Sequence, residues 1–329
     1  MLGFSLYFDR DFDLEEEVRK YEGFDILFTS IHYPEGGNTF EKFLNLCEKS
    51  INKDFRICVD LNKDVLTRYP KLMDMDLILR LDYGFNSKEI AELSKNNRIS
   101  INASTIDREY LDEILAFGAN TDNILAIHNY YPLEFTGLGG DYLRRRNDLF
   151  KSLGIEAIAF VPGNENLRGP MYRSLPSLES QRLKDPYLSF VELKRKYGMD
   201  SVIIAEGVDD RNIFRIRDFH KDRKLSLKVN MNDEFNYIKG FKQRMDLSEF
   251  ILRNEREYRK VEAGPSFYAK RGDILILNEK AGRYSGEIEI CKEDLGPVED
   301  RNLIGKVDAE HIELIDYIKG GDEIVFNRR

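Results

Sequence analysis

Eight short apolar runs recur along the first two thirds of the chain, and helical patterns separate them. The runs span residues 2–8, 24–31, 55–61, 77–82, 98–104, 123–129, 155–161 and 201–207. Strands that are apolar on both faces and are each followed by an amphipathic helix are typical of a parallel sheet covered by helices. Eight such units predict an α/β fold of the (β/α)8 type, the TIM barrel, because an open doubly wound sheet commonly has fewer strands.

The segments between the runs support this prediction. Two of them carry apolar residues at helical spacing: Phe40, Phe43, Leu44, Cys47 and Ile51 in the first, and Tyr110, Leu111, Ile114 and Leu115 in the second. Gly118 then stands where a glycine often ends a helix. The connection that starts at residue 162 is unusually long, and long ordered loops at the carboxyl end of a barrel are usually functional.

The pattern changes after Asp222. The remaining runs are short or alternate between apolar and polar residues, and glycines are frequent among them. Residues 278–286 are typical of a hairpin loop and residues 320–326 of a closing strand. We therefore expect a barrel domain over residues 1–222 and a smaller β-rich domain over residues 223–329.

Composition and charge narrow the class of protein. Hydrophobic residues make up 42% of the chain and charged residues 33%, and no apolar run approaches the roughly 18 residues that a membrane helix needs. The N-terminal segment turns acidic where a signal peptide would stay apolar, so we expect a cytoplasmic protein with no membrane partner. The net charge of −9 and the lack of a basic stripe argue against nucleic-acid binding.

The cysteines predict neither a disulfide framework nor a zinc site. Cys47, Cys58 and Cys291 are widely separated, and none belongs to a CxxC motif. We expect them to be reduced and buried, as free cysteines commonly are.

Polar residues concentrate where the predicted strands end. In a barrel, reacting residues lie at the carboxyl ends of the strands and in the loops that follow. In chain order, these positions hold Asp9, His32, Glu35, Asp60, Arg80, Asp82, Asn102, Ser104, His128, Asn129, Asn164, Arg168 and Glu206. Four or five carboxylates would therefore meet at one mouth, together with two histidines and at least two arginines.

Structural roles compete with functional ones at these positions. Asp9 and Asp60 could cap the helices that follow them, and Glu35 could be an exposed loop acid. Arg80 and Asp82 are alternate residues of one strand, so both side chains share a face. Their pairing would lower the pKa of Asp82, which suits a nucleophile or a base better than an acid.

The absence of certain motifs narrows the class of reaction that the predicted site could catalyse. A Schiff-base aldolase needs a lysine on a barrel strand, and none of the eight runs ends in one. The His-x-His motif common in metal-dependent hydrolases is absent, although a mixed site of Asp, Glu and His for a divalent ion remains open. Glycoside hydrolysis is the metal-free chemistry that suits several acids, because one carboxyl group protonates the leaving oxygen while another attacks or activates water.

Seven segments, taken in order, carry a resemblance to a known family. They are "SIHYPE", "LRLDYGF", "ISINAST", "IHNYYPLEFTGL", "AFVPGN", "RGPMYRSLPSLESQR" and "GRYSGEIEI". Together they resemble the bacterial 6-phospho-N-acetylmuramidase family, formerly a domain of unknown function and once mislabelled outer surface protein. The resemblance implies a (β/α)8 barrel followed by a small C-terminal β-barrel that looks like cyclophilin. It also implies hydrolysis of the β-1,4 bond in N-acetylmuramic acid 6-phosphate–N-acetylglucosamine, a cytoplasmic disaccharide of cell-wall turnover.

The motifs of that family fall on defined positions of this sequence. The matching positions are His32, Pro34 and Glu35, then Arg80, Asp82, Gly84 and Phe85, then Asn102 to Thr105, then His128, Asn129, Tyr131 and Pro132, then Arg168, Gly169 and Pro170, and finally Leu175, Pro176, Leu178 and Glu179. The sequence departs from the family where "IIAEG" replaces a Gly-Asp ending and where "DLNKD" follows Asp60 in place of a Ser-Pro pair. These departures weaken Glu206 and the surroundings of Asp60 as transferred sites.

The strand ends and the resemblance together define the predicted site. We expect the catalytic acid and its partner among Glu35, Asp60 and Asp82, with Asp82 the first choice. The expected substrate-binding residues are His32, Arg80, Asn102, His128, Asn129, Tyr131 and Arg168. Arginine suits phosphate and carboxylate groups because its planar fork binds two oxygens at once. Arg283 and Tyr284 either reach over the barrel mouth, from their own or a neighbouring subunit of a homodimer, or belong to a plain hairpin loop.

We expect no metal and no cofactor, and we expect the phosphorylated amino-sugar disaccharide as the partner. After the sixth run, His128 and Asn129 should face the barrel mouth with Tyr131 just above, whereas Tyr130 should point away. Two other functions remain open. A metal-dependent sugar-phosphate isomerase or epimerase would be sensitive to chelators, and a non-catalytic sensing module would bind the phosphorylated disaccharide without cleaving it.

Overall fold

A computed structural model describes residues 1–9, 12–32, 38–255 and 258–328 of the chain. The chain divides into two compact units, Met1–Ile213 and Phe214–Arg329. Each unit is described by itself. No helix among the described residues is long and apolar enough to cross a membrane.

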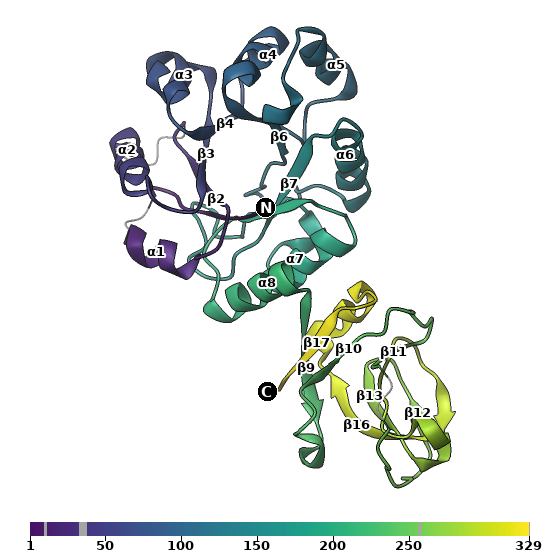
Figure 1. Cartoon of the computed structure of the whole chain (residues 1–329). Coiled ribbons are helices and arrows are strands. Elements are labelled where there is room, and N and C mark those ends of the chain that lie inside the picture. The colour runs from purple at the N-terminus through teal and green to yellow at the C-terminus, as the bar shows by residue number, and fades with distance from the viewer. Residues whose placement is uncertain (10–11, 33–37, 256–257, 329) are drawn as a thin grey trace. The chain divides into compact units, whose positions relative to one another are not determined.

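The first unit is a closed barrel of eight parallel strands in chain order, with helices around the outside (Figure 1). The strands are β1 (Leu2–Ser5), β2 (Ile26–Ser30), β3 (Arg56–Leu61), β4 (Leu77–Leu81), β5 (Arg98–Asn102), β6 (Ile124–Ile127), β7 (Glu156–Val161) and β8 (Ser201–Ile204). Each lies within one of the eight apolar runs. The predicted (β/α)8 barrel is confirmed.

Helices follow the strands in the order that the sequence predicts. They are α1 (Leu14–Lys20), α2 (Thr39–Lys49), α3 (Lys63–Arg68), α4 (Ser87–Asn96), α5 (Arg108–Ala116), α6 (Gly140–Ser152), α7 (Pro186–Arg195) and α8 (Asp210–Asp222). Short 3-10 helices are η1 (Pro70–Asp74), η2 (Thr121–Asn123) and η3 (Glu179–Gln181). Acidic or amide side chains cap several helix starts; Asn86, for example, forms a capping box with Glu89 at the start of α4.

The predicted helix faces are confirmed in part. In α5, Leu111 and Ile114 are buried, and Gly118 follows the helix with a φ of 79°, a left-handed conformation that glycine adopts at little cost. In α2, Phe43 is buried as predicted, but Ile51 is 76% exposed because the helix already ends at Lys49.

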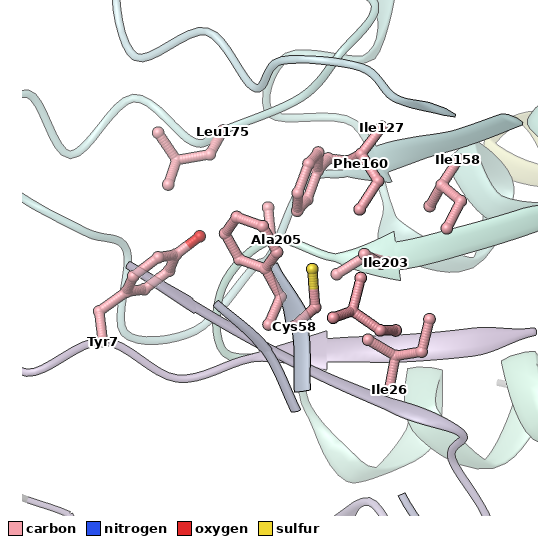
Figure 2. Packing of buried hydrophobic residues seen from close by; sticks show 11 residues of the cluster. Tyr7, Ile26, Cys58, Ile127, Ile158, Phe160, Leu175, Ile203 and Ala205 are labelled. Atoms are coloured by element: carbon pink, nitrogen blue, oxygen red, sulfur yellow. The ribbon is translucent and has the colours of Figure 1, made fainter. Parts of the chain in front are cut away.

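Inward-pointing side chains fill the barrel with an apolar core (Figure 2). Phe160 of β7 packs edge to face on Phe28 of β2, with 5.0 Å between the ring centroids. Cys58 of β3 and Ile78 of β4 belong to the same cluster. Because side chains alternate along a strand, the inward direction continues two residues later at Asp60 and Arg80. The apolar core therefore gives way to charged groups at the carboxyl ends of the strands.

The second unit is a mixed, curled sheet of seven strands in the order β10-β17-β9-β16-β13-β14-β11, with a separate pair β12-β15. The strands are β9 (Lys224–Met231), β10 (Gly240–Lys242), β11 (Ile251–Arg253), β12 (Phe267–Ala269), β13 (Asp273–Leu277), β14 (Ile288–Cys291), β15 (Gly296–Val298), β16 (Arg301–Val307) and β17 (Glu323–Arg328), with the 3-10 helices η4 (Asp233–Phe235), η5 (Glu279–Tyr284) and η6 (Ala309–Tyr317). The predicted hairpin loop joins the antiparallel strands β13 and β14, and the predicted closing strand is β17. The likeness to cyclophilin stays a prediction.

The three cysteines are free thiols, as the sequence predicts. Cys58 and Cys291 are buried, whereas Cys47 is only partly so. Burial raises the pKa of Cys47 and of Cys291 to about 12. These thiols are therefore protonated and unreactive near neutral pH.

Phe28 is a suitable position for testing the packing of the barrel core, because its ring contacts several other buried rings. Replacing Phe28 with alanine should lower the free energy of unfolding by about 3–5 kcal/mol, since the fully buried ring leaves a cavity behind. Thermal and urea unfolding followed by circular dichroism would measure the loss. The control is Phe117→Ala at a side chain that is 49% exposed, where the change should stay within about 0.5 kcal/mol. Equal losses in both variants would contradict the assignment of the core.

Candidate active site

A cavity of about 760 Å³ opens at the carboxyl ends of the barrel strands. This volume is within the usual range for ligand pockets, roughly 300–1,000 Å³. The charged residues that line it are Asp9, Asp60, Arg80, Asp82, Arg168 and Glu206. All of them belong to the first unit, so the barrel by itself forms this cavity.

Arg80 lies at the centre of the charged groups. Its Nη1 donates a hydrogen bond to the carboxylate of Asp60 and lies 3.4 Å from Oδ1 of Asp82. Its Nη2 donates to Oδ1 of Asn129 at 2.6 Å. One buried guanidinium therefore holds together side chains from β3, from the end of β4 and from the segment after β6.

His32 connects the two aspartates from the end of β2. Its Nε2 lies 3.3 Å from Oδ2 of Asp82, and its Nδ1 lies 3.6 Å from Oδ2 of Asp60. Burial alone would lower the pKa of His32, but the hydrogen bond to Asp82 and the negative charge of Asp60 outweigh burial and raise it. His32 therefore binds a proton more readily than a free imidazole does.

The pKa values of the two aspartates shift in opposite directions. Burial raises the pKa of Asp60, although Arg80 and His32 oppose the shift. Burial also disfavours the charged form of Asp82, but the hydrogen bond from His32 and the charge of Arg80 outweigh burial and lower its pKa. The side chain of Asp82 is 19% exposed and that of Asp60 is 5% exposed. Asp82 is therefore the ionised carboxylate that a ligand in the cavity can reach.

The same residues also have some of the geometry of a metal site. His32, Asp60 and Asp82 offer ligand atoms within 4.8 Å of one another, which is close enough for one ion. However, Nη1 of Arg80 bonds to Asp60 and lies beside Asp82, so a fixed cation already neutralises the carboxylates that a divalent ion would need. The group fits an ion-paired carboxylate centre better than a metal centre.

His128 does not face the barrel mouth, and that prediction is wrong. Ile127, the last residue of β6, points into the barrel core, so the alternation of the strand turns His128 toward the surrounding helices. His128 is fully buried, with Nδ1 3.2 Å from Oγ of Ser104. Burial and the charge of Arg146 lower its pKa to about 3. His128 is therefore a neutral group outside the cavity.

The predicted orientations of Tyr130 and Tyr131 are reversed. Tyr130 lines the cavity and packs edge to face on Phe160, with 5.2 Å between the ring centroids. Tyr131 is not among the lining residues, and its backbone N–H donates to the carbonyl of Pro176 at 3.1 Å. The reason is that β6 ends at Ile127, so the two-residue alternation of a strand does not extend to these tyrosines.

Asn102 also lies outside the cavity lining. Its side chain is buried, and its Oδ1 accepts a hydrogen bond from the backbone N–H of Ser104 at 3.0 Å. Such a bond is typical of an Asx turn, in which the side chain fixes the backbone two residues on. Asn102 therefore shapes the turn after β5.

Arg168 lines the cavity from the loop between β7 and α7. Its guanidinium carbon lies 3.8 Å from the ring centroid of Tyr7, and its Nη1 donates to the hydroxyl of Tyr130 at 2.9 Å. Its Nε lies 3.6 Å from Oδ2 of Asp9. A cation–π contact, a hydrogen bond and an ion pair therefore fix this arginine.

Glu206 holds the same loop in place. Its carboxylate accepts hydrogen bonds from the backbone N–H groups of Arg168 at 2.7 Å and Leu175 at 3.0 Å. Burial raises the pKa of Glu206, although these hydrogen bonds oppose the shift. Glu206 is therefore built into the loop that carries Arg168.

Glu179 and Arg182 join this loop to the segment after β6. Arg182 binds Glu179 through two hydrogen bonds of 2.7 and 2.8 Å and donates to the carbonyl of Leu133. Glu179 also accepts from the backbone N–H groups of Phe135 and Gly137. The bonds from Arg182 lower the pKa of Glu179 to about 2. The Leu-Pro-x-Leu-Glu motif thus fixes one wall of the site.

One predicted site residue falls outside the described part of the chain, and two belong to the second unit. Glu35 falls in residues 33–37, outside the described part of the chain. Arg283 and Tyr284 belong to η5 of the second unit, where Nη2 of Arg283 donates to the hydroxyl of Tyr284 at 2.8 Å. Their reach over the barrel mouth stays a prediction.

Sequence reasoning missed three tyrosines of the cavity. Tyr7, Tyr130 and Tyr172 line it, but none of them was predicted to do so. The alternation in "SLYFD" carried the signal for Tyr7, because Ser5, Tyr7 and Asp9 are alternate residues that share a face with the cavity. No comparable pattern points to Tyr130 or Tyr172, which belong to the loops after β6 and β7.

The opposite pKa shifts of two histidines can be measured. We expect His32 to titrate above the ordinary value for histidine and His128 to stay neutral down to pH 4. Because the folded state raises the pKa of His32, protonated His32 stabilises the fold below the ordinary pKa, and this contribution is lost as the pH rises through the raised value. Heteronuclear NMR of the imidazole groups would give both titrations. Asp82→Asn should lower the pKa of His32 and leave that of His128 unchanged; an unshifted His32 would refute the contact.

Comparison with known proteins places the chain in a family. Models of 6-phospho-N-acetylmuramidase match it over residues 2–215 (N-terminal part) and 224–327 (C-terminal part). No curated protein sequence matches the chain.

Two solved structures are similar to the chain. A conserved protein of unknown function from a locus in Enterococcus faecalis is 29% identical, with a TM-score of 0.87 over 100% of this chain and 96% of that one. An uncharacterized B. cereus protein is 25% identical, with a TM-score of 0.79 over 99% of both chains. The family models together cover nearly the whole sequence. The chain therefore belongs to the 6-phospho-N-acetylmuramidase family and is a glycoside hydrolase.

Proposed function

We propose that this chain hydrolyses the β-1,4 bond of N-acetylmuramic acid 6-phosphate–N-acetylglucosamine with Asp82 as the central catalytic group. The observation that carries the proposal is the state of Asp82, which is ionised, reachable from the cavity and held by His32 and Arg80. Glycosidases need such a carboxylate to attack the sugar or to activate water. A lowered pKa suits this role and does not suit proton donation.

Asp60 acts as a supporting group in this scheme. The two carboxyl groups of a glycosidase normally flank the scissile bond, one to donate a proton and one to attack or activate water. Asp60 and Asp82 instead share one nitrogen of Arg80, so both lie on the same side of the cavity. Asp60 fixes Arg80 and His32, which in turn orient Asp82. We therefore propose Glu35, the third carboxylate of the predicted set, as the proton donor.

Arg168 and Asn129 are the proposed substrate-binding residues of the cavity wall. The substrate carries a phosphate and a carboxylate, and the cavity has two cationic lining residues in the described part of the chain, Arg80 and Arg168. Arg80 is paired with Asp60 and lies beside Asp82, whereas Arg168 has one carboxylate of a described residue beside its guanidinium, that of Asp9, 3.6 Å from Nε. An anionic group of the sugar is therefore expected at Arg168, whose guanidinium suits phosphate and carboxylate oxygens.

The setting of the reaction follows from the substrate class. We propose a cytoplasmic enzyme of cell-wall recycling that acts after the disaccharide has been phosphorylated during uptake. It would need neither a metal nor another cofactor, and a homodimer is its proposed assembly if Arg283 and Tyr284 serve a neighbouring barrel.

Asp82→Asn tests the catalytic assignment. The variant should lose about a hundredfold to ten-thousandfold in kcat, which is the usual contribution of a catalytic acid or base, because the amide cannot attack or take a proton. Release of N-acetylglucosamine from the phosphorylated disaccharide would be followed by mass spectrometry. Asp112→Asn, at an exposed aspartate paired with Arg108 on α5, is the matched control and should keep full activity. Wild-type turnover by Asp82→Asn would remove Asp82 from the mechanism.

Chelation separates hydrolysis from the metal-dependent isomerase alternative. Dialysis against EDTA should leave the release of N-acetylglucosamine unchanged, because Arg80 supplies the positive charge between the carboxylates. Activity that falls on dialysis and returns with a divalent ion would favour a metal site at His32, Asp60 and Asp82. Tight binding of the disaccharide with no product at all would favour the sensing module.

A further inference from the structure

Tyr7 occupies a position in the cavity that the scheme above does not use. It follows β1, its side chain is buried with 6% exposed, and it lines the cavity together with Leu175. Figure 2 shows Tyr7 and Leu175 at the same end of the buried cluster. Its ring lies under the guanidinium of Arg168, 3.8 Å from ring centroid to guanidinium carbon. Tyr7 is thus in contact with the proposed anion-binding arginine.

The hydroxyl of Tyr7 is buried and forms no hydrogen bond with any described residue. The hydroxyl groups of Ser5 and Tyr130 lie close enough to lower the pKa of Tyr7, but neither meets it at hydrogen-bond geometry; Ser5 donates to the carbonyl of Ile204 at 2.8 Å, and Tyr130 accepts from Arg168 at 2.9 Å. Buried polar groups of native proteins almost always have a hydrogen-bond partner, so an unpaired one in a cavity wall requires an explanation. A ligand in the cavity would supply the partner.

The chemistry of the hydroxyl suits an anionic ligand. Burial raises the pKa of Tyr7 to about 12, although the nearby charge of Arg168 opposes the shift. The phenol is therefore protonated near neutral pH and can donate a hydrogen bond. Bonds from a neutral donor to a charged oxygen are stronger than bonds between neutral groups.

The neighbouring carboxylates do not accept a hydrogen bond from the Tyr7 hydroxyl. Both oxygens of Glu206 accept backbone N–H groups, one from Arg168 and one from Leu175. Asp9 lies at the Nε edge of Arg168, at 3.6 Å, and is no partner of the Tyr7 hydroxyl. The Tyr7 hydroxyl and the Arg168 guanidinium are therefore a donor and a cation that are adjacent in the cavity wall.

We propose that Tyr7 is a substrate-binding residue whose hydroxyl donates a hydrogen bond to the same anionic group, phosphate or carboxylate, that Arg168 binds. The ring of Tyr7 at the same time holds the guanidinium plane. This inference rests on the proposed function, because it takes the phosphorylated amino sugar as the ligand. It assigns the anionic end of that sugar to the part of the cavity formed by Tyr7 and Arg168, and the scissile bond to the part formed by Asp82.

Tyr7→Phe tests this assignment, because it removes only the hydroxyl. Isothermal titration calorimetry would measure binding of three ligands: N-acetylmuramic acid 6-phosphate, N-acetylglucosamine 6-phosphate and N-acetylmuramic acid. The variant should bind the first about tenfold more weakly, as expected for a lost hydrogen bond to a charged group. If the variant also loses affinity for N-acetylglucosamine 6-phosphate by the same factor, the bound group is the phosphate. If it instead loses affinity for N-acetylmuramic acid by that factor, the bound group is the carboxylate. Tyr21→Phe removes the hydroxyl of another buried tyrosine, one outside the cavity lining, and should bind all three as wild type does.

Thermal unfolding separates binding from a structural role. Because the hydroxyl has no partner at hydrogen-bond geometry among the described residues, Tyr7→Phe should unfold at the same or a higher temperature than wild type, while the rise in unfolding temperature on adding ligand should shrink. A lower unfolding temperature with unchanged affinities would overturn the proposal. If wild type cleaves the disaccharide and Tyr7→Phe binds all three ligands normally, only the assignment of Tyr7 fails. If wild type neither cleaves nor binds, the proposed function fails with it.

Discussion

The ion pair between Arg80 and the two aspartates is the constraint on which the site depends. A buried charge is costly unless it is paired, and removing one partner of a buried pair typically costs about 3–5 kcal/mol. Arg80 meets this requirement by bonding to Asp60 and lying beside Asp82, and it positions Asn129 as well. The residues that neutralise one another's buried charges therefore also fix the Asp82 carboxylate at the cavity.

Much of this arrangement could be predicted from the sequence. The eight apolar runs predict the barrel because parallel strands are buried on both faces. The barrel then predicts where Asp60, Arg80 and Asp82 meet, because all of them stand at strand ends. Even the shared direction of Arg80 and Asp82 follows from the alternation of β4. These predictions succeed because they depend only on the geometry of regular strands.

The predictions that fail lie just beyond the strand ends. His128 points outward because Ile127, the residue before it, faces the barrel core, and Tyr130 turns into the cavity where the strand alternation no longer applies. The face of β6 that is turned to the core decides the first outcome and the end of the strand decides the second, and both depend on tertiary packing. The sequence predicts the lowered pKa of Asp82 from its pairing with Arg80, but it does not predict the raised pKa of Asp60, because that shift depends on burial.

The central claim is that an ion-paired carboxylate centre in this barrel cleaves an anionic amino sugar. Product analysis with matched substrates tests it most directly: the purified protein is incubated with N-acetylmuramic acid–N-acetylglucosamine with and without the 6-phosphate, and the products are identified by mass spectrometry. We predict N-acetylglucosamine and N-acetylmuramic acid 6-phosphate from the phosphorylated disaccharide, with much slower cleavage of the other. No release from the phosphorylated form, or equal release from both, would contradict the account.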